Sequence, residues 1–334
     1  MPEIINNTIT AIPGLKVGQA QNTAAVTGCT VVICEQGAVA GVDQRGGAPG
    51  TRETDLLHPM HMVEKIHAIV LTGGSAYGLD AAAGVMQYLE ENNIGLNVGV
   101  GRVPIVPAAV LFDLAIGDPH IRPDKQMGYQ ACLNATNEPV KQGNCGAGTG
   151  ATVGKILGMG QAMKSGIGSS VIHLGGGLLV AALIAVNAFG DVIDPKNGQI
   201  IAGARSIEKG PIRIGDQGIF ANTLETMRTF AGKSILRFAA SQNTVIGVVA
   251  TNARLTKEEA NKVAQMSHNG LAKTIQPAHT MFDGDTIFCM ATGSKKADVN
   301  LVGAYAVEAV STAVTNAVKF ADSHYNLPCY RSIN

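Results

Sequence analysis

Short apolar runs closed by glycine-rich turns recur along most of this chain, and this alternation restricts the folds that it can adopt. Residues 29–34, 68–71 and 244–250 have the length and the β-branched content of buried strands. Glycine supplies 41 of the 334 residues, about 12% against a usual ~7%, and follows no collagen-like period. Glycines in this number serve tight turns and close backbone approaches, so we expect thin elements packed in layers.

Helical spacing of apolar residues separates several of these runs. Helices are predicted over four segments, residues 79–91, 124–135, 256–269 and 300–324. The third begins with a capping sequence at Thr256. Strands and helices that alternate without internal repeats indicate a single mixed α/β domain over residues 1–334, with its weakest seam at about 200–243.

Glycines also set the expected connections between strands. Residues 169–174 and 178–186 flank three consecutive glycines and predict a hairpin. Residues 29–34 and 38–42 are expected to form neighbouring strands joined by a turn. Between residues 195 and 242 the chain is more polar and irregular, which predicts an exposed excursion from the fold.

The charge balance argues against a protein that binds polyanions. Acidic and basic residues number 25 each, the formal net charge is zero, and the nearest candidate for a basic run is the pair Lys295 and Lys296. The longest apolar run, residues 178–186, is too short to cross a bilayer. We therefore expect neither a nucleic-acid partner nor a membrane span.

Cysteine usage and the first residues of the chain indicate the cytoplasm. Six cysteines are scattered without a CxxC pair, which is typical of reduced thiols. The first 18 residues lack the basic start and apolar run of a secretory signal. We expect a cytoplasmic protein without disulfides.

A glycine-rich segment at residues 143–155 resembles a phosphate-binding loop but lacks the required spacing. Gly154 and Lys155 are followed by Ile156, so no hydroxyl is placed to hold magnesium. A loop that lets backbones approach closely is therefore the preferred interpretation, and we expect no nucleotide cofactor.

Neither a metal site nor a conventional serine hydrolase is indicated. His58 and His61 lack a third ligand in their neighbourhood, and the chain contains no HExxH motif or aspartate-rich calcium loop. Residues 74–78 depart from the GxSxG spacing of a nucleophile elbow. We expect solvated histidines and no metal.

Two polar features at strand ends could carry chemistry if the fold brings them together. Thr244 follows Asn243 at the junction between the polar excursion and an apolar strand. Asp283 and Asp285 are expected to open a later strand. Residues two apart on a strand share one face, about 6.6 Å apart. Taken separately, these features are ordinary strand starts and turns.

Five runs resemble the L-aminopeptidase/D-esterase family, which includes β-aminopeptidases and endo-type 6-aminohexanoate (nylon) oligomer hydrolases. They are residues 41–54, 71–80, 101–109, 143–155 and 186–191. The resemblance implies an αββα four-layer sandwich of the N-terminal-nucleophile type. It also implies a chain that cuts itself before a serine or threonine, which then becomes the nucleophile.

Carried over to this sequence, the resemblance puts the cut between Asn243 and Thr244, giving an α subunit of residues 1–243 and a β subunit of residues 244–334. Thr244 is then the catalytic nucleophile. A free α-amine has a pKa of ~7.7–8.0, so near neutral pH it can take the hydroxyl proton itself. No catalytic histidine is needed.

The resemblance assigns further roles around this threonine. Asp283 and Asp285 match the paired polar positions of the family, and an Asp-x-Asp pair with a threonine nucleophile is similar to the nylon-oligomer hydrolases. Lys164 corresponds to a lysine that offers positive charge, and Asn187 to the asparagine that stabilises the oxyanion. Tyr129 corresponds to an active-site tyrosine.

The function implied is a self-processing amide hydrolase that acts on 6-aminohexanoate oligomers or peptides without a cofactor, as a homotetramer of α/β pairs. Three alternatives stay open: an aminopeptidase for peptides with N-terminal D- or β-residues, an acyltransferase of the ornithine acetyltransferase type, and a binding protein that keeps the fold without the chemistry. Cleavage at Asn243 separates the amide hydrolase, the aminopeptidase and the acyltransferase from the binding protein, which would keep its chain intact.

Overall fold

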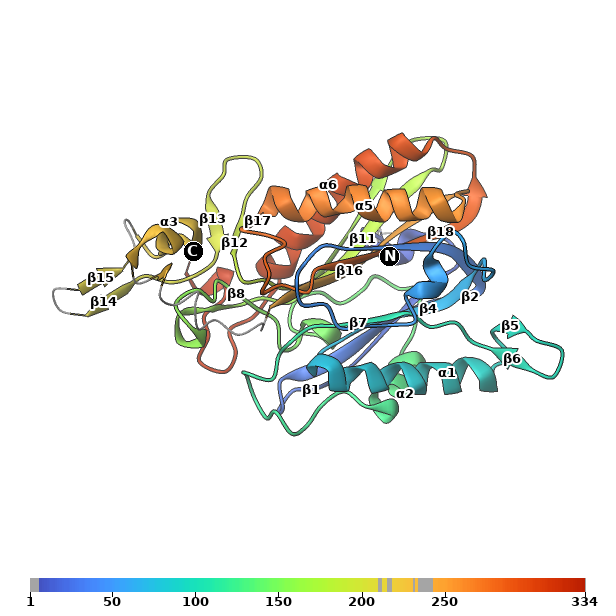
Figure 1. The fold of residues 1–334 in the computed structure, drawn as a ribbon, viewed down its shortest axis with the longest axis horizontal. Coiled ribbons are helices and arrows are strands. Elements are labelled where there is room, and N and C mark those ends of the chain that lie inside the picture. The colour runs from blue at the N-terminus through green and yellow to red at the C-terminus, as the bar shows by residue number, and fades with distance from the viewer. Residues whose placement is uncertain (1–5, 210–211, 215–217, 231, 234–242, 334) are drawn as a thin grey trace, which may run out of the picture.

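The computed structural model of the protein describes residues 6–209, 212–214, 218–230, 232–233 and 243–333. Two β-layers face each other between two pairs of helices (Figure 1). The main strands of the described chain form one ladder in the order β10, β11, β16, β18, β2, β4, β7 and β3, with β1 also paired to β2. The architecture is the αββα sandwich expected from the resemblance.

Each layer is defined by its strands. The first layer comprises β1 (Leu15–Asn22), β2 (Thr27–Gln44), β3 (Thr51–Arg52), β4 (Ile66–Thr72) and β7 (Ala108–Val110). The second comprises β10 (Ile167–His173), β11 (Leu179–Asn187), β16 (Thr244–Ala253) and β18 (Thr286–Lys295), with the end of β2. The antiparallel pair of β10 and β11 confirms the predicted hairpin.

The long strand β2 belongs to both layers. It pairs with β4 as far as Ala38, and residues 39–44 then pair with β18. The prediction of two strands joined by a turn is therefore wrong. Glu35 and Gln36 are exposed, and Gly37 at φ +73° lies within a shift of register, so the strand is distorted there without ending.

Side chains on β16 show how the layers are filled. Val245 and Val249 pack in the core beneath the outer helices, whereas Ile246 and Val248 pack between the two β-layers. Successive side chains of a strand point to opposite faces, so a strand covered on both sides needs apolar residues throughout. This explains why residues 244–250 form an almost continuous apolar run.

Helices cover both outer faces. The helices α1 (Ala81–Glu91) and α2 (Lys125–Leu133) pack on the first layer, and α5 (Lys257–Thr274) and α6 (Val299–Lys319) on the second. All four predicted helices are confirmed, and Thr256 forms a capping box with Glu259 at the start of α5. The last helix ends before residue 324, because Asn144 hydrogen-bonds the backbone of Asp322 and holds that segment on a loop.

Helix α6 is the one helix in the described chain that is long and apolar enough to cross a membrane by length and composition. In the fold, 67% of its most apolar window is buried inside the protein. Val302, Val310 and Val314 pack on the second β-layer, as expected for a core helix. The apolar character of α6 is therefore accounted for by the sandwich.

The polar stretch after β11 leaves the sandwich (Figure 1). Its elements, with the short strand that pairs to them, are β12 (Asp191–Ile193), β13 (Ile200–Ala202), β14 (Ile207–Lys209), β15 (Ile212–Ile214), α3 (Thr223–Arg228) and β17 (Ile275–Gln276). The Asp191 carboxylate accepts hydrogen bonds from Ala204 and Thr223 and so anchors the excursion. Residues 234–242, the end of the predicted excursion, lie outside the described residues.

Shorter elements complete the described chain. Two-residue strands form the pairs β5 (Leu96–Asn97) with β6 (Arg102–Val103) and β8 (Thr152–Val153) with β9 (Met163–Lys164). Turns of 3₁₀ helix are η1 (Ile9–Ala11), η2 (Asp55–Leu57), η3 (Ser75–Asp80), η4 (Gly146–Gly148), η5 (Met159–Gln161) and η6 (Tyr330–Ser332).

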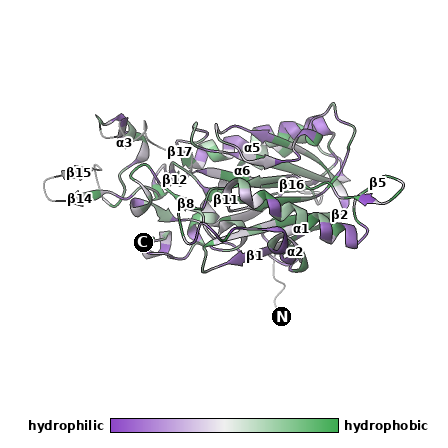
Figure 2. Ribbon diagram, turned by 60° about the horizontal axis from the view of Figure 1, so that its bottom comes forward, coloured by the Kyte–Doolittle hydropathy of each residue, from purple (hydrophilic) through white to green (hydrophobic). Residues whose placement is uncertain are grey.

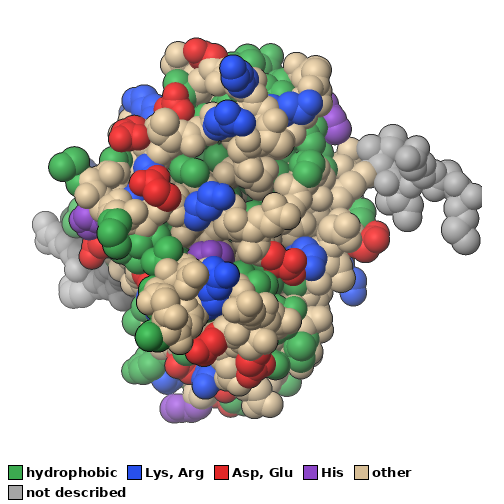
Figure 3. All heavy atoms as spheres, turned by 90° about the vertical axis from the view of Figure 1, so that its right-hand side faces the viewer, with side chains coloured by type: hydrophobic (Ala, Val, Ile, Leu, Met, Phe, Trp, Pro, Cys, Tyr) green, Lys and Arg blue, Asp and Glu red, His purple; other side chains and the backbone are tan. Residues whose placement is uncertain are grey.

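Polarity follows the layers. Hydrophobic residues, green in Figure 2, are concentrated in the strands of the sandwich. On the face drawn in Figure 3, acidic and basic side chains are interspersed among the described residues. All six cysteines lie in the described part of the chain, where they are buried and unpaired.

Candidate active site

Thr244 and Asn187 meet at the end of two neighbouring strands. Thr244 begins β16 and is directly opposite Asn187, the last residue of β11, in the antiparallel register. Both side chains are buried, with Asn187 fully inaccessible. The strand pairing thus joins two predicted site residues that lie far apart in the sequence.

The peptide between Asn243 and Thr244 is held in a polar setting. The Thr244 hydroxyl donates a hydrogen bond to the Asn243 carbonyl oxygen. The same oxygen accepts the backbone N–H of Gly284 at 3.0 Å. A Cβ at Gly284 would lie 2.5 Å from the Ala48 carbonyl oxygen, so only glycine allows this approach.

Asp283 lies beside this peptide in a buried network. Its Oδ2 accepts the Thr280 hydroxyl at 2.5 Å and the Thr280 N–H at 3.1 Å, and its Oδ1 accepts the Phe189 N–H at 3.2 Å. Burial, followed by the charge of Asp285, raises the pKa of Asp283 to about 6. The Asp283 carboxyl can therefore hold a proton at weakly acidic pH.

Asp285 connects directly to the residue that follows the threonine. Its Oδ1 accepts the Val245 N–H at 2.9 Å. Its Oδ2 accepts both the backbone N–H of His279 at 3.1 Å and the Nδ1 of the same histidine at 2.8 Å. Both aspartates precede β18, which begins at Thr286, so they approach Thr244 from the segment leading into that strand.

A loop from the first layer supports the two aspartates. Arg45 N–H donates to the Asp285 carbonyl oxygen at 3.0 Å, and Ala48 N–H donates to that of Asp283 at 2.9 Å. A Cβ at Gly46 would lie 2.1 Å from the Asp283 carbonyl oxygen. This contact gives a physical reason for glycine in the run of residues 41–54.

Lys155 lies at the site, although the sequence pattern of residues 143–155 indicates only a glycine-rich loop around it. Its Nζ donates to Asn187 Oδ1 at 2.7 Å and to the Asn187 carbonyl oxygen at 3.0 Å. Burial lowers its pKa to about 7, against the attraction of Asp283 and Asp113. The available signal was a lysine at the end of the 143–155 segment with no phosphate-loop role.

Asn187 is oriented by contacts on both sides of its amide. Its Nδ2 donates to the Phe112 carbonyl oxygen at 2.8 Å, and its Oδ1 accepts the Thr152 N–H at 3.1 Å as well as Lys155 Nζ. These partners define which way the amide faces.

Lys164 is buried behind this group. Its Nζ donates to the carbonyl oxygens of Ser165 at 2.7 Å, Ala151 at 2.8 Å and Gly148 at 3.3 Å. In the β8–β9 pair it lies opposite Thr152, which itself contacts Asn187. The lysine that hydrogen-bonds Asn187 is therefore Lys155, whereas Lys164 hydrogen-bonds backbone carbonyl oxygens.

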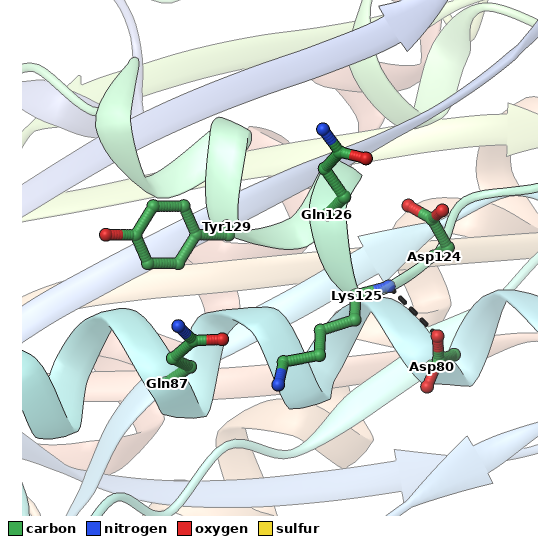
Figure 4. A pocket seen from close by; sticks show the side chains of 6 residues that line it. All are labelled: Asp80, Gln87, Asp124, Lys125, Gln126 and Tyr129. Atoms are coloured by element: carbon green, nitrogen blue, oxygen red, sulfur yellow. Dashed lines mark hydrogen bonds between the residues drawn. The ribbon is translucent and has the colours of Figure 1, made fainter.

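The structure does not bring Tyr129 to Thr244. Tyr129 lies on α2, on the outer side of the first β-layer, and its hydroxyl donates to Glu91 on α1 at 2.7 Å. It lines a surface pocket with Asp80, Gln87 and Lys125 (Figure 4). A sequence resemblance around this tyrosine could not show which face of the sheet its helix would cover.

The histidines and other possible metal ligands form no metal centre in the described chain. His58 and His61 are exposed, as expected for solvated side chains. Within the described ranges, no group of three or more His, Cys, Asp or Glu side chains is arranged to hold a metal ion.

Comparison with known proteins places this fold and sequence in context. A family model described as peptidase family S58 matches residues 7–326. An uncharacterized aminopeptidase of Mycobacterium leprae is 39% identical, covering 97% of this chain and 93% of that protein. A 6-aminohexanoate-oligomer endohydrolase of a Kocuria species is 32% identical, covering 92% and 84%.

A solved structure is similar over nearly the whole fold. The L-aminopeptidase D-Ala-esterase/amidase of Ochrobactrum anthropi, a variant of the Ntn hydrolase fold, superposes with a TM-score of 0.68. It is 18% identical and covers 95% of this chain and 86% of its own. With a family model spanning almost all of its length and relatives above 30% identity, this αββα protein belongs to peptidase family S58 and is an amide-bond hydrolase.

Proposed function

We propose that the protein is a self-processing amide hydrolase in which Thr244 is the nucleophile. One observation carries the proposal: the Thr244 hydroxyl contacts the carbonyl group of Asn243, whose oxygen already accepts the Gly284 N–H. A hydroxyl beside a polarised carbonyl is the arrangement that an acyl shift needs. The neighbouring Asp283, Asp285 and Asn187 are buried polar groups that can orient the reacting atoms.

Self-cleavage follows from this arrangement. The Thr244 hydroxyl oxygen attacks the Asn243 carbonyl carbon, the peptide C–N bond breaks, and the hydroxyl proton passes to the leaving nitrogen. Water then hydrolyses the ester, which returns the threonine hydroxyl and leaves a carboxylate on Asn243. The products are an α subunit of residues 1–243 and a β subunit of residues 244–334.

Turnover repeats this chemistry on a substrate amide. The new α-amine, with a pKa of ~7.7–8.0, accepts the Thr244 hydroxyl proton and donates it to the leaving amine. Water then releases the acyl group. We assign stabilisation of the oxyanion to Asn187, which lies opposite Thr244 in the β-sheet. Lys155, instead of Lys164, supplies positive charge through its contact with Asn187 Oδ1.

Oligomeric amides are the proposed substrates, with 6-aminohexanoate oligomers first and peptides second. The pair of aspartates beside a threonine and the 32% identity to a 6-aminohexanoate-oligomer endohydrolase support the first. The 39% identity to a protein named as an aminopeptidase supports testing peptides with N-terminal D- or β-residues. We propose further that the enzyme is cytoplasmic and works without a cofactor. We also propose that it is a homotetramer, and sedimentation analysis tests this oligomeric state.

The proposal is tested by whether the purified protein consists of one chain or of two fragments. Dividing 34.4 kDa in the ratio 243 to 91 gives fragments of about 25 and 9 kDa, which denaturing electrophoresis and mass spectrometry should detect. Thr244→Ala should leave one chain, because the attacking hydroxyl is gone. Cleavage at another bond, or two fragments in the alanine variant, removes Thr244 from the mechanism.

Product analysis separates the remaining alternatives. A hydrolase releases new amines and free acids from oligoamides, whereas an acyltransferase requires an acceptor amine and returns an amide. An intact wild-type chain without turnover of any amide would instead support a binding protein. Asp283→Ala and Asp285→Ala should each slow both self-cleavage and turnover, since the same hydroxyl is oriented in both reactions.

A further inference from the structure

His279 contacts the site in an unusual backbone conformation. Its φ of +58° lies in the left-handed region, which non-glycine residues adopt only where the surrounding structure holds them. In this conformation its backbone N–H and its ring Nδ1 both reach the same oxygen of Asp285. The other oxygen of that carboxylate accepts the N–H of Val245, the residue after the proposed nucleophile.

The far side of the His279 ring contacts a second buried histidine. His268 of α5 packs against it edge to face, with ring centroids 4.9 Å apart. The Nε2 of His268 is 2.9 Å from the Asp43 carbonyl oxygen, so this nitrogen is the donor. The Asp43 carboxylate is held in turn by Arg45 at 2.7 Å.

Two imidazole nitrogens in this group have no hydrogen-bond partner within the described chain. They are His279 Nε2 and His268 Nδ1, both buried. Burial lowers the pKa of His268 to about 4, so this ring is neutral at neutral pH and brings no charge toward His279. His279 therefore faces one carboxylate, Asp285, and one neutral ring.

We propose that His279 is a positioning residue for the reaction, which holds the Asp285 carboxylate directed at the backbone beside Thr244. The inference rests on the proposed function, since it concerns how the threonine is supported. Three N–H groups donate to Asp285, two of them from His279. Donors to a carboxylate favour its charged form, and a fixed carboxylate fixes the start of β16.

Loss of the ring should move the protonation of the carboxyl pair. Asp283 and Asp285 interact, so their protons come off in steps that belong to the pair. Removing the donor at Nδ1 takes away one contact that favours the charged form of the carboxyl pair. In a plot of the self-cleavage rate against pH, the fall in rate on the acidic side, here called the acid limb, should then shift to higher pH.

Self-cleavage of the precursor is the reaction in which to measure this limb. Before cleavage the Thr244 nitrogen is an amide, so no titrating α-amine masks the carboxyl groups. Chains made by cell-free translation can be shifted to a series of pH values while the appearance of the 91-residue fragment is followed. The rate constant at each pH gives the position of the limb.

His279→Gly isolates the ring, because glycine adopts φ +58° freely and keeps the backbone N–H bond to Asp285. Losing a hydrogen bond to a charged group should slow self-cleavage roughly 10- to 100-fold at pH 7 and raise the limb by about one to two pH units. In His279→Asn, the asparagine tolerates the left-handed region and offers an amide donor. The rate and the acid limb of this variant should therefore lie between those of wild type and His279→Gly.

Asn93→Gly is the matched control. Asn93 also has φ +58° but is exposed at the end of α1, so this variant should cleave like wild type across the pH range. If His279→Gly lowers the rate equally at every pH, or leaves both rate and limb unchanged, the positioning role is wrong. If that variant fails to fold, the limb of His279→Asn decides in the same way.

Thr244→Ala separates the two possible failures. A Thr244→Ala chain that still produces the 91-residue fragment overturns the proposed function itself. If Thr244→Ala stays intact while His279→Gly behaves like wild type, only the role of His279 is overturned.

Discussion

Lys155 and Lys164 are two buried lysines in similar electrostatic settings, yet they contact different parts of the molecule. Burial lowers the pKa of each to about 7. Lys155 donates to Asn187, which lies opposite Thr244 in the β-sheet, whereas Lys164 donates to three backbone carbonyl oxygens. A perturbed pKa thus marks a candidate, and the hydrogen-bond partner shows what the group can act on.

Replacing Lys155 should have the largest effect on turnover and is the most direct test of the difference between the two lysines. Lys155→Met removes the charge beside the oxyanion donor and one partner that orients Asn187, so turnover of an oligoamide should fall by about 1000-fold. The measurement is kcat/KM from the release of new amines. Lys164→Met is the matched control, and equal losses in the two variants would contradict the distinction between them.

Asn187→Ala should have the next largest effect. Loss of one preorganised oxyanion donor typically costs ~100- to 1000-fold in rate, and Asn187 lies opposite Thr244 in the register. Single-turnover kinetics on an oligoamide would locate the loss in the chemical step. Loss of substrate binding with an unchanged chemical step would remove Asn187 from that role.

Lys164→Met should lower stability and leave the chemistry of the folded enzyme nearly intact. Three carbonyl oxygens lose a donor in a fully buried site, which should cost ~1–3 kcal/mol of unfolding free energy. Urea unfolding of the uncleaved Thr244→Ala chain, with and without the change, measures this cost. An unchanged midpoint would show that the three hydrogen bonds add nothing.

The two lysines should contribute similarly to the pH dependence of stability. Each folded-state pKa is about 7 against an ordinary 10.5, so between these values the unfolded chain binds more protons and stability rises with pH. Each lysine adds at most about 1.4 kcal/mol per pH unit in that window. Urea midpoints of the Thr244→Ala chain between pH 7 and 10 should rise, and each Lys→Met change should reduce the slope.

Tyr129→Phe should have the smallest effect. The hydroxyl contacts Glu91 on the outer surface. Its removal from an exposed pair should change activity by less than about twofold and leave the thermal unfolding midpoint nearly unchanged. The same kcat/KM assay checks the first value and thermal unfolding the second. A large fall in activity would show that Tyr129 takes part in the reaction after all.

Local patterns were enough to predict most elements of the fold. The hairpin around glycines 175–177 and the capping box at the start of α5 depend on residues close in sequence, and both are present. The turn predicted at residues 35–37 failed for the opposite reason. Whether an exposed Glu-Gln-Gly sequence ends a strand or only distorts it depends on the partners, β4 and β18, that pair on either side.

The sequence by itself determined the type of fold, the resemblance to a hydrolase family and the candidates Thr244, Asp283, Asp285 and Asn187. Only the tertiary structure decided that Lys155 contacts Asn187, that Lys164 lies behind it, and that Tyr129 is on another layer. The physical reason is the distance along the sequence over which each interaction acts. Periodicity and capping act over a few residues, whereas the register of β11 against β16 and the choice of sheet face join residues tens of positions apart.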